Sequence, residues 1–448
     1  MTARIRSTPK RAQAAPDRMS AKDRLVWRLE MDTDIRPIIV LVFLLEERPD
    51  DDHLRKWHME AARRLPRMAA RVARYGGRLG MPRWIPDPSF DPSPHIRNVR
   101  VPGKGTPAEL LRLVEDISQT PFVPNRPLWE CHIVEGLEDG KTAYVLKISH
   151  AIADGLRLRD LFAQQSPPQT STAGHRREGI QPEPQPPSPS APAEQRPLSP
   201  RLRRARDAAR FGALVVRDVR NPPSAPRGSG DGVARRYFCV DLPMAGLRAA
   251  ARQADGTVQD ALVAGLTDGL HRYNTHWEVD RPRMQVFSPY GRAPLTRHDP
   301  SPVGNHWFIV RFEVPAGAPD TGTRIRAARS AVRRVYHRDA LDWMGAVARI
   351  APFVPARLLQ VAFRHFAGSH DFIISNIPGP RSQIRVAGAT AERLYGIAPT
   401  LGAALTATSV SYGDTCHVTL NIDPAVVRDP DLLASCLRES LEKVTCND

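Results

Sequence analysis

Residues 142–155 read TAYVLKISHAIADG and combine a strand pattern with a polar turn. Side chains alternate in character over residues 142–149, as in a β-strand that packs on a core. The strand ends at His150, whose ordinary pKa near 6.5 suits proton abstraction at neutral pH. Asp154 can hold the backbone or an Arg and so fix the turn, and Gly155 can adopt a backbone angle that other residues resist. A His at a strand end also serves structural roles, so this short pattern alone leaves both interpretations open.

The rest of the chain predicts a mixture of helices and strands on both sides of this stretch. Apolar periodicity predicts helices over residues 53–74, 107–117, 257–276, 340–366 (broken near Pro352–Pro355) and 431–444. Alternation or short apolar runs predict strands over residues 38–45, 129–134, 307–314, 372–374, 405–412 and 417–422. The pattern is that of an α+β protein.

A proline-rich segment divides the chain. Ten prolines fall between Gln164 and Pro200, which predicts an extended linker. The stretch from Arg201 to Arg220 has apolar residues at helical spacing among arginines, which fits either a helix lying in a lipid interface or a linker helix packed on the protein. We therefore expect an N-terminal half at 1–163, a linker with a basic amphipathic helix at 164–231, and a C-terminal half at 232–448.

Composition excludes several classes of protein. The 448 residues are 41% hydrophobic, so a sizeable core is expected. The net charge of +16 would suit binding to nucleic acid or to an anionic membrane surface. The longest apolar run, Ile38–Leu45, is far short of the roughly 20 residues of a spanning helix, and residues 1–24 lack the pattern of a secretory signal. Five scattered cysteines without a C-x-x-C indicate a reducing compartment, so we expect a cytoplasmic protein without a metal site.

Several motifs in a fixed order surround the first stretch. They are PRWIPDPSFDPSPHIR, PLWE at 127–130, SHAIADG at 149–155, TVQDALVAGL, VGNHWFIVRFEVP and DFIISNIPGP. Together they resemble the bacterial wax ester synthase/acyl-CoA:diacylglycerol acyltransferase family, within the CoA-dependent acyltransferase superfamily. The resemblance implies two chloramphenicol-acetyltransferase-like sheet-and-helix halves with a channel between them.

The family motif H-H-x-x-x-D-G maps onto this sequence with one departure. Its second His, the general base in the family, matches His150, and its Asp and Gly match Asp154 and Gly155. The resemblance therefore makes His150 and Asp154 the catalytic candidates, with Gly155 in support. The first His of the pair is Ser149 here, so a neighbour thought to shape the site is replaced.

Other family motifs map onto residues expected to support the site. The P-L-W motif matches Pro127, Leu128 and Trp129, which would place the strand that leads to His150. The family Asn-Asp pair matches Gln259 and Asp260, so Asn is replaced by Gln. Asp260 also lies three residues after a Thr, which equally predicts a capping box at a helix start.

A last group of residues are candidates for lining the site. Asn376 begins a turn motif NIPGP after a buried strand, and Gly304-Asn305 matches another family turn. Ser375, Asn376 and Ser409 are candidates by residue type for donating a hydrogen bond to an oxyanion.

The resemblance implies transfer of a long-chain acyl group from acyl-CoA, as co-substrate and without a bound cofactor, to diacylglycerol or a fatty alcohol. Such a protein is expected to lie peripherally on a membrane or lipid-droplet surface. The replacements at 149 and 259 motivate an alternative, a degenerate member that binds acyl-CoA or lipid without turnover. Another alternative is a transferase with a different acceptor, such as a polyketide hydroxyl. A nucleic-acid-binding protein ranks last, because no recognisable module accompanies the charge.

Overall fold

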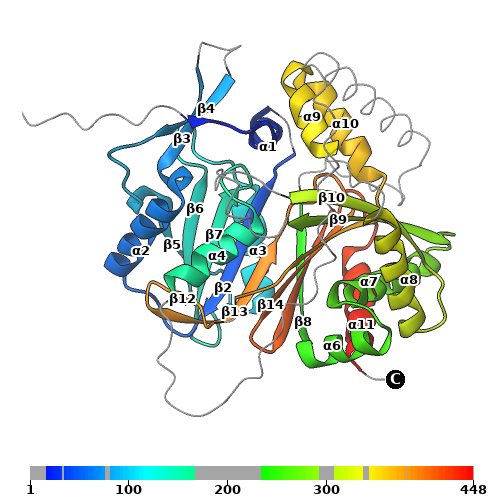
Figure 1. Ribbon diagram of the computed structural model, residues 1–448. Coiled ribbons are helices and arrows are strands. Elements are labelled where there is room, and N and C mark those ends of the chain that lie inside the picture. The colour runs from blue at the N-terminus through cyan, green and yellow to red at the C-terminus, as the bar shows by residue number, and fades with distance from the viewer. Residues whose placement is uncertain are drawn as a thin grey trace, which may run out of the picture.

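The computed structural model describes residues 17–32, 35–75, 81–166, 234–291, 307–336, 343–380 and 382–446. The predicted linker helix at 201–220 and the turn Gly304-Asn305 lie outside these ranges. Two six-stranded sheets, one in each half, dominate the architecture (Figure 1).

The first sheet is built mainly from the N-terminal half. Its order is β12 (Arg385–Val386), β13 (Ala389–Ile397), β2 (Ile38–Leu45), β7 (Thr142–Ser149), β6 (Trp129–Glu135) and β5 (Ile96–Arg100). The run IIVLVFLL forms β2 in the interior of the sheet, where seven of its eight residues are buried, as expected for a strand covered on both faces. The predicted boundary at residue 232 describes the order along the chain, but this sheet also takes two strands from the C-terminal half.

The second sheet lies wholly in the C-terminal half. Its order is β10 (Trp307–Pro315), β9 (Arg283–Gly291), β11 (Phe372–Ile377), β14 (Leu405–Tyr412), β15 (Thr415–Ile422) and β8 (Arg236–Pro243). A small third sheet has the order β1 (Asp17–Arg18), β4 (Met81–Pro86) and β3 (Ala70–Tyr75).

Helices cover the two large sheets (Figure 1). The N-terminal half contributes α1 (Ala21–Asp32), α2 (Asp51–Arg64), η1 (Pro66–Ala69), η2 (Ser93–His95), α3 (Pro107–Gln119) and α4 (Gly155–Gln165). The C-terminal half contributes α6 (Met244–Gln253), α7 (Val258–His276), α8 (Thr321–Tyr336), α9 (Trp343–Ile350), η3 (Ala351–Phe353), α10 (Ala356–Gly368) and α11 (Pro430–Thr445). The expected α+β architecture of two sheet-and-helix halves is therefore confirmed.

One predicted helix is wrong in its second part. The expected helix at 53–74 ends at Arg64, and the chain continues as η1 and then as strand β3. Pro66 explains the break, because its ring clashes with a preceding helical turn and it has no N–H to donate.

Three clusters of buried apolar side chains form the core. One belongs mainly to the N-terminal sheet and its helices, and a second belongs to the C-terminal sheet with α7 and α11. The third is smaller and joins α1 to β9, β10, α9 and α10, so that it connects the two halves.

Candidate functional site

The turn that carries His150 is anchored by backbone hydrogen bonds. His150 is half-buried directly after β7, and its N–H donates to the carbonyl of Pro37 at 3.0 Å. The N–H of Ile152 donates to the carbonyl of Ser149 at 3.0 Å. These bonds tie the turn to the strand ends on both sides, so the position of the His150 backbone is determined by the sheet.

Asp154 closes the turn as the N-cap of α4. Its carboxylate accepts a hydrogen bond of 3.0 Å from the backbone N–H of Arg157, an arrangement that satisfies a helix-end donor and places a negative charge at the positive end of the helix. The prediction that Asp154 fixes the turn is confirmed. This contact is a structural one, and the catalytic role expected of Asp154 stays a prediction.

A buried ion pair supports the same turn from below. Arg67 donates to the carbonyl of Ala151 at 3.0 Å, and its other guanidinium nitrogen lies 3.0 Å from Asp23 of α1. Both side chains are buried, with 6% and 0% of their surface exposed. Removing either side chain would leave the other charge buried and unpaired, which strongly destabilises a protein.

Gly155 departs from its prediction and instead lies close to a residue of the other half. It does not have a positive φ, so the expected unusual backbone angle is wrong. Instead, a Cβ at this position would lie 2.6 Å from Cδ1 of Ile377, at the end of β11. Arg159, one turn further along α4, donates to the carbonyl of Pro378 at 3.3 Å. The His150 motif therefore lies where the two halves meet.

The P-L-W residues hold the neighbouring strand. The carbonyl of Leu128 accepts from the N–H of Ser149 at 2.9 Å, and Trp129 is fully buried. The indole Nε1 of Trp129 donates to the carbonyl of Met68 at 2.8 Å, and the rings of His58 and His95 stack on the indole. Pro127 accepts from the N–H of Trp129 at 2.9 Å. This geometry agrees with the expected supporting role.

Sequence reasoning missed Glu30, on α1. The hydroxyl of Ser149 donates to Oε2 of Glu30, and the same hydroxyl accepts from the N–H of Ala151 at 3.2 Å. Glu30 Oε1 is buried and has no hydrogen-bond partner within the described ranges. Burial raises the pKa of Glu30 to about 8, against the opposing effects of the Ser149 hydrogen bond and of Lys147. The residue that replaces the first motif His is thus bonded to a carboxyl group that stays protonated at neutral pH.

Lys147 lies two residues before Ser149, on the same face of β7. Its side chain is fully buried, donates to the carbonyl of Thr120 and lies 3.7 Å from Glu130. Burial lowers the pKa of Lys147 to about 8.

No sequence motif marks Glu30. The helix α1 that carries it has buried apolar residues at 25, 26 and 29, and their spacing could have shown which face of the helix meets the core.

Gln259 and Asp260 begin α7. Thr257 and Asp260 form the predicted capping box, and Asp260 also lies 3.5 Å from Arg329. The amide of Gln259 donates to Oγ of Ser288 at 2.9 Å, and that hydroxyl donates to a main-chain carbonyl of β11 at 3.0 Å. The capping interpretation of Asp260 is confirmed, and the longer Gln is accommodated by the sheet.

The three oxyanion candidates are divided between two faces of β11 and β14. Asn376 Oδ1 accepts from Oγ of Ser409 at 2.9 Å, and these two residues are register partners. Alternation along β11 places Ser375 on the other face, the one from which Ile377 contacts Gly155. Of the three, Ser375 therefore shares a face with the contact to the His150 motif.

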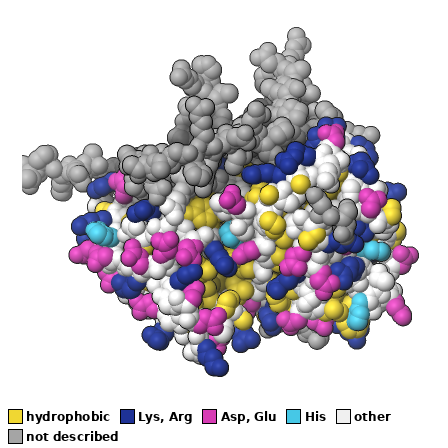
Figure 2. Space-filling model, turned by 90° about the horizontal axis from the view of Figure 1, so that it is seen from below, with side chains coloured by type: hydrophobic (Ala, Val, Ile, Leu, Met, Phe, Trp, Pro, Cys, Tyr) yellow, Lys and Arg dark blue, Asp and Glu magenta, His cyan; other side chains and the backbone are white. Residues whose placement is uncertain are grey.

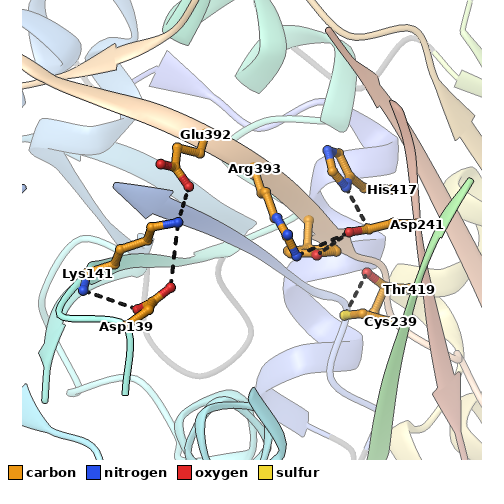
Figure 3. A network of polar contacts seen from close by, with 9 residues as sticks. Asp139, Lys141, Cys239, Asp241, Glu392, Arg393, His417 and Thr419 are labelled. Carbon is orange, nitrogen blue, oxygen red and sulfur yellow. Dashed lines mark hydrogen bonds and ion pairs between the residues drawn. The ribbon is translucent and has the colours of Figure 1, made fainter. Parts of the chain in front are cut away.

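A second polar cluster connects the two sheets away from His150 (Figure 3). His417 lies 2.7 Å from Asp241, and Asp241 also accepts from Tyr395 at 3.1 Å and lies 3.3 Å from Arg393. Cys239 lies near Thr419 on the same strands. Tyr395 and Arg393 belong to β13 of the first sheet, so this cluster fastens the crossing strand to the second sheet.

Other chemistries find little support within the described ranges. There, no group of three or more His, Cys, Asp or Glu side chains could hold a metal ion. Burial raises the pKa of the Cys131 thiol far above its usual range, which opposes formation of a nucleophilic thiolate. None of the helices in these ranges is both long and apolar enough to cross a membrane.

Comparison with known proteins identifies the family of the chain. Residues 19–262 match the wax ester synthase/diacylglycerol acyltransferase (WS/DGAT) catalytic domain, and residues 303–445 match the WS/DGAT C-terminal domain. A putative diacylglycerol O-acyltransferase of Mycobacterium tuberculosis is 29% identical, covering 96% of this chain and 91% of the relative. A probable diacylglycerol O-acyltransferase of the same species is 25% identical, covering 82% of each chain.

Solved structures share the fold. A wax ester synthase/diacylglycerol acyltransferase from Marinobacter aquaeolei superposes with a TM-score of 0.64 at 20% identity, covering 95% of this chain and 98% of that one. The first condensation domain of the calcium-dependent antibiotic synthetase superposes with a TM-score of 0.63 at 15% identity, covering 96% and 97%.

Proposed function

Because this chain belongs to the wax ester synthase/diacylglycerol acyltransferase family, we propose that it moves a long-chain acyl group from acyl-CoA to a lipid hydroxyl, with His150 as general base. At the level of the family the activity is acyl-CoA-dependent transfer to a lipid alcohol, so the chain is an acyltransferase. The observation that carries the assignment of His150 is its place in a turn anchored to the sheet by backbone hydrogen bonds, at the junction of the two halves, where Gly155 lies close to Ile377.

The proposed reaction is a direct transfer. A ring nitrogen of His150 takes the proton of the acceptor hydroxyl while the oxygen attacks the thioester carbonyl carbon. A C–O bond forms, the C–S bond then breaks, and the CoA thiolate recovers the proton from His150. Acyl-CoA is the co-substrate, and no further cofactor takes part.

The surroundings of His150 supply positioning and polarity. Asp154 and the Arg67 guanidinium hold the turn, so that the backbone that carries the base is in place before substrate binds. Ser375 is the side chain best placed to donate to the oxyanion, because it faces the same side of β11 as Ile377.

The proposed acceptors are apolar lipids, so we also propose that the enzyme works at a lipid surface. Diacylglycerol and long-chain alcohols are concentrated in membranes and lipid droplets. Identifying the preferred acceptor requires an assay of both.

The test measures free thiol released from a long-chain acyl-CoA, with diacylglycerol or hexadecanol as acceptor. We compare the wild type with His150→Ala and with His53→Ala, a matched control at an exposed residue of α2. Acceptor-dependent release that His150→Ala loses and His53→Ala keeps is the expected result. Bound acyl-CoA with equal background release in all three proteins would instead identify a binder without turnover and would overturn the proposal.

A further inference from the structure

The segment formed by η3 and α10 exposes large apolar side chains to an unusual degree. Phe353 is 72% exposed, Leu358 61% and Val361 64%, which are the highest exposures of large hydrophobic residues within the described ranges. Leu358 and Val361 lie three residues apart, so they share one face of α10. Single exposed apolar residues are ordinary, but three gathered on one segment mark an interaction surface.

The opposite face of α10 is apolar as well. Leu359 and Phe363 are buried in the core cluster that joins the two halves. Phe363 and Phe366 also line a small pocket beneath the helix, together with Phe287, Ile309, His370, Ile373 and Leu401. A helix that is apolar on both sides is expected to be covered on both sides. Within the described ranges only the inner face is covered, so we expect the outer face to meet a partner.

The charge of this segment indicates the partner. Residues 343–368 contain no Asp or Glu and three arginines, Arg349, Arg357 and Arg364. Arg357 and Arg364 are exposed beside the apolar face of α10. By contrast, acidic and basic side chains are interspersed over the face shown in Figure 2. Exposed apolar residues flanked by arginines are typical of a helix that lies in an anionic lipid interface.

The segment is held firmly on the protein. The guanidinium of Arg28, on α1, donates to the carbonyls of Ala351 and Val354, at either end of η3. Figure 1 shows α9 and α10 together at the top of the C-terminal half, with α1 beside them. The segment that carries the exposed apolar residues is therefore bonded to the rest of the protein.

We propose that η3 and the outer face of α10 dock on an anionic lipid surface. This inference deepens the proposed function, because it names the face of the protein that would meet the lipid. The docking itself is measurable without any turnover.

The docking test uses co-sedimentation with vesicles of phosphatidylcholine and phosphatidylglycerol, and with phosphatidylcholine alone. Leu358→Gln/Val361→Gln is compared with Met81→Gln/Val123→Gln, which replaces two exposed apolar residues elsewhere. We expect the first variant to lower vesicle partition about tenfold or more, because two aliphatic side chains no longer enter hydrocarbon, and the control to bind as the wild type. Arg357→Glu is expected to remove the preference for the anionic vesicles.

Unchanged partition of Leu358→Gln/Val361→Gln overturns the docking proposal. Light scattering identifies the rival occupant, because a wild type that self-associates and a variant that does not would show that a second copy covers this face. Both readouts are independent of catalysis.

Discussion

Replacing Glu30 by Gln tests the protonated carboxyl beside the catalytic turn. The native carboxyl accepts from Ser149, and burial raises its pKa to about 8 from an ordinary 4.5. Between these two values the unfolded chain has released the proton while the native protein keeps it, so this group makes the protein less stable as pH rises. Gln has the shape of the protonated acid and cannot ionise. The variant should therefore lose this component of the pH dependence.

The expected change in the free energy of unfolding follows from the size of the pKa shift of Glu30. A change from 4.5 to about 8 corresponds to roughly 5 kcal/mol at about 1.4 kcal/mol for each pH unit. The residue keeps some exposed surface, so water offsets part of this cost. We therefore compare the free energies of unfolding of Glu30→Gln and the wild type. Their difference is expected to grow in favour of the variant by about 2–4 kcal/mol as pH rises from about 5 to about 7.5.

The assay is urea unfolding of both proteins across this range. Burial lowers the pKa of His58 to about 4, which makes the protein more stable as pH rises through the acidic range, but that contribution is present in both proteins and cancels in their difference. Glu109→Gln is the matched control without a pH dependence in this range. Hydrogen bonds from Thr106 lower the pKa of Glu109, so its contribution to stability is already complete above its ordinary 4.5, and the difference between this variant and the wild type should stay constant from pH 5 to pH 7.5.

A difference between Glu30→Gln and the wild type that stays constant from pH 5 to pH 7.5 would refute the reasoning. It would mean that Glu30 is ionised at neutral pH and that Ser149 donates to a carboxylate. Acyl transfer gives a second readout, because an uncharged Glu30 predicts near wild-type activity for the Gln variant at neutral pH.

Three further substitutions test the site and its supports. Asp154→Ala should lower the free energy of unfolding by about 1 kcal/mol in urea titrations and reduce acyl transfer, whereas Asp154→Asn should keep both the helix cap and the activity. An Asn variant that is stable but inactive would contradict a positioning role for Asp154. Trp129→Phe leaves a buried main-chain carbonyl without its donor and should cost about 1–3 kcal/mol, seen as a lower Tm; an unchanged Tm would show that the stacking matters more than the hydrogen bond. Gly379→Ala places a Cβ 1.5 Å from the carbonyl oxygen of Ser411 and should lower the free energy of unfolding by at least about 2 kcal/mol. Gly368→Ala is the control, because its Cβ meets open space and should not destabilise the protein in the same thermal unfolding assay. Equal stability of the two variants would show that the turn at Gly379 relaxes.

Strong local patterns predicted many elements correctly. Strands 38–45 and 405–412 have the bounds that alternation and apolar runs predict, and residues 142–149 form the predicted strand before His150. The capping box at Thr257 marks the start of α7. Where the local signals conflicted, as over residues 53–74, a proline outweighed the apolar periodicity.

Sequence motifs also located most of the candidate site. The order of the motifs is enough to group His150, Asp154 and Gly155 with the P-L-W residues. The predicted role of Gly155 is nevertheless wrong, because the steric restriction comes from a residue more than two hundred positions away. Glu30 escapes prediction for the same reason, since nothing adjacent to it in sequence shows that it meets Ser149.

The sequence by itself determined the fold class, the family and the residue expected to act as base, because these depend on local periodicity, on caps and on several short motifs in a fixed order along the chain. Only the tertiary structure decided which residues meet across the two halves. It placed β13 in the first sheet, set Ile377 against Gly155, bonded Ser149 to Glu30, and left the outer face of α10 exposed. Such contacts join segments far apart in the chain, and their energies depend on packing and burial that no local pattern records.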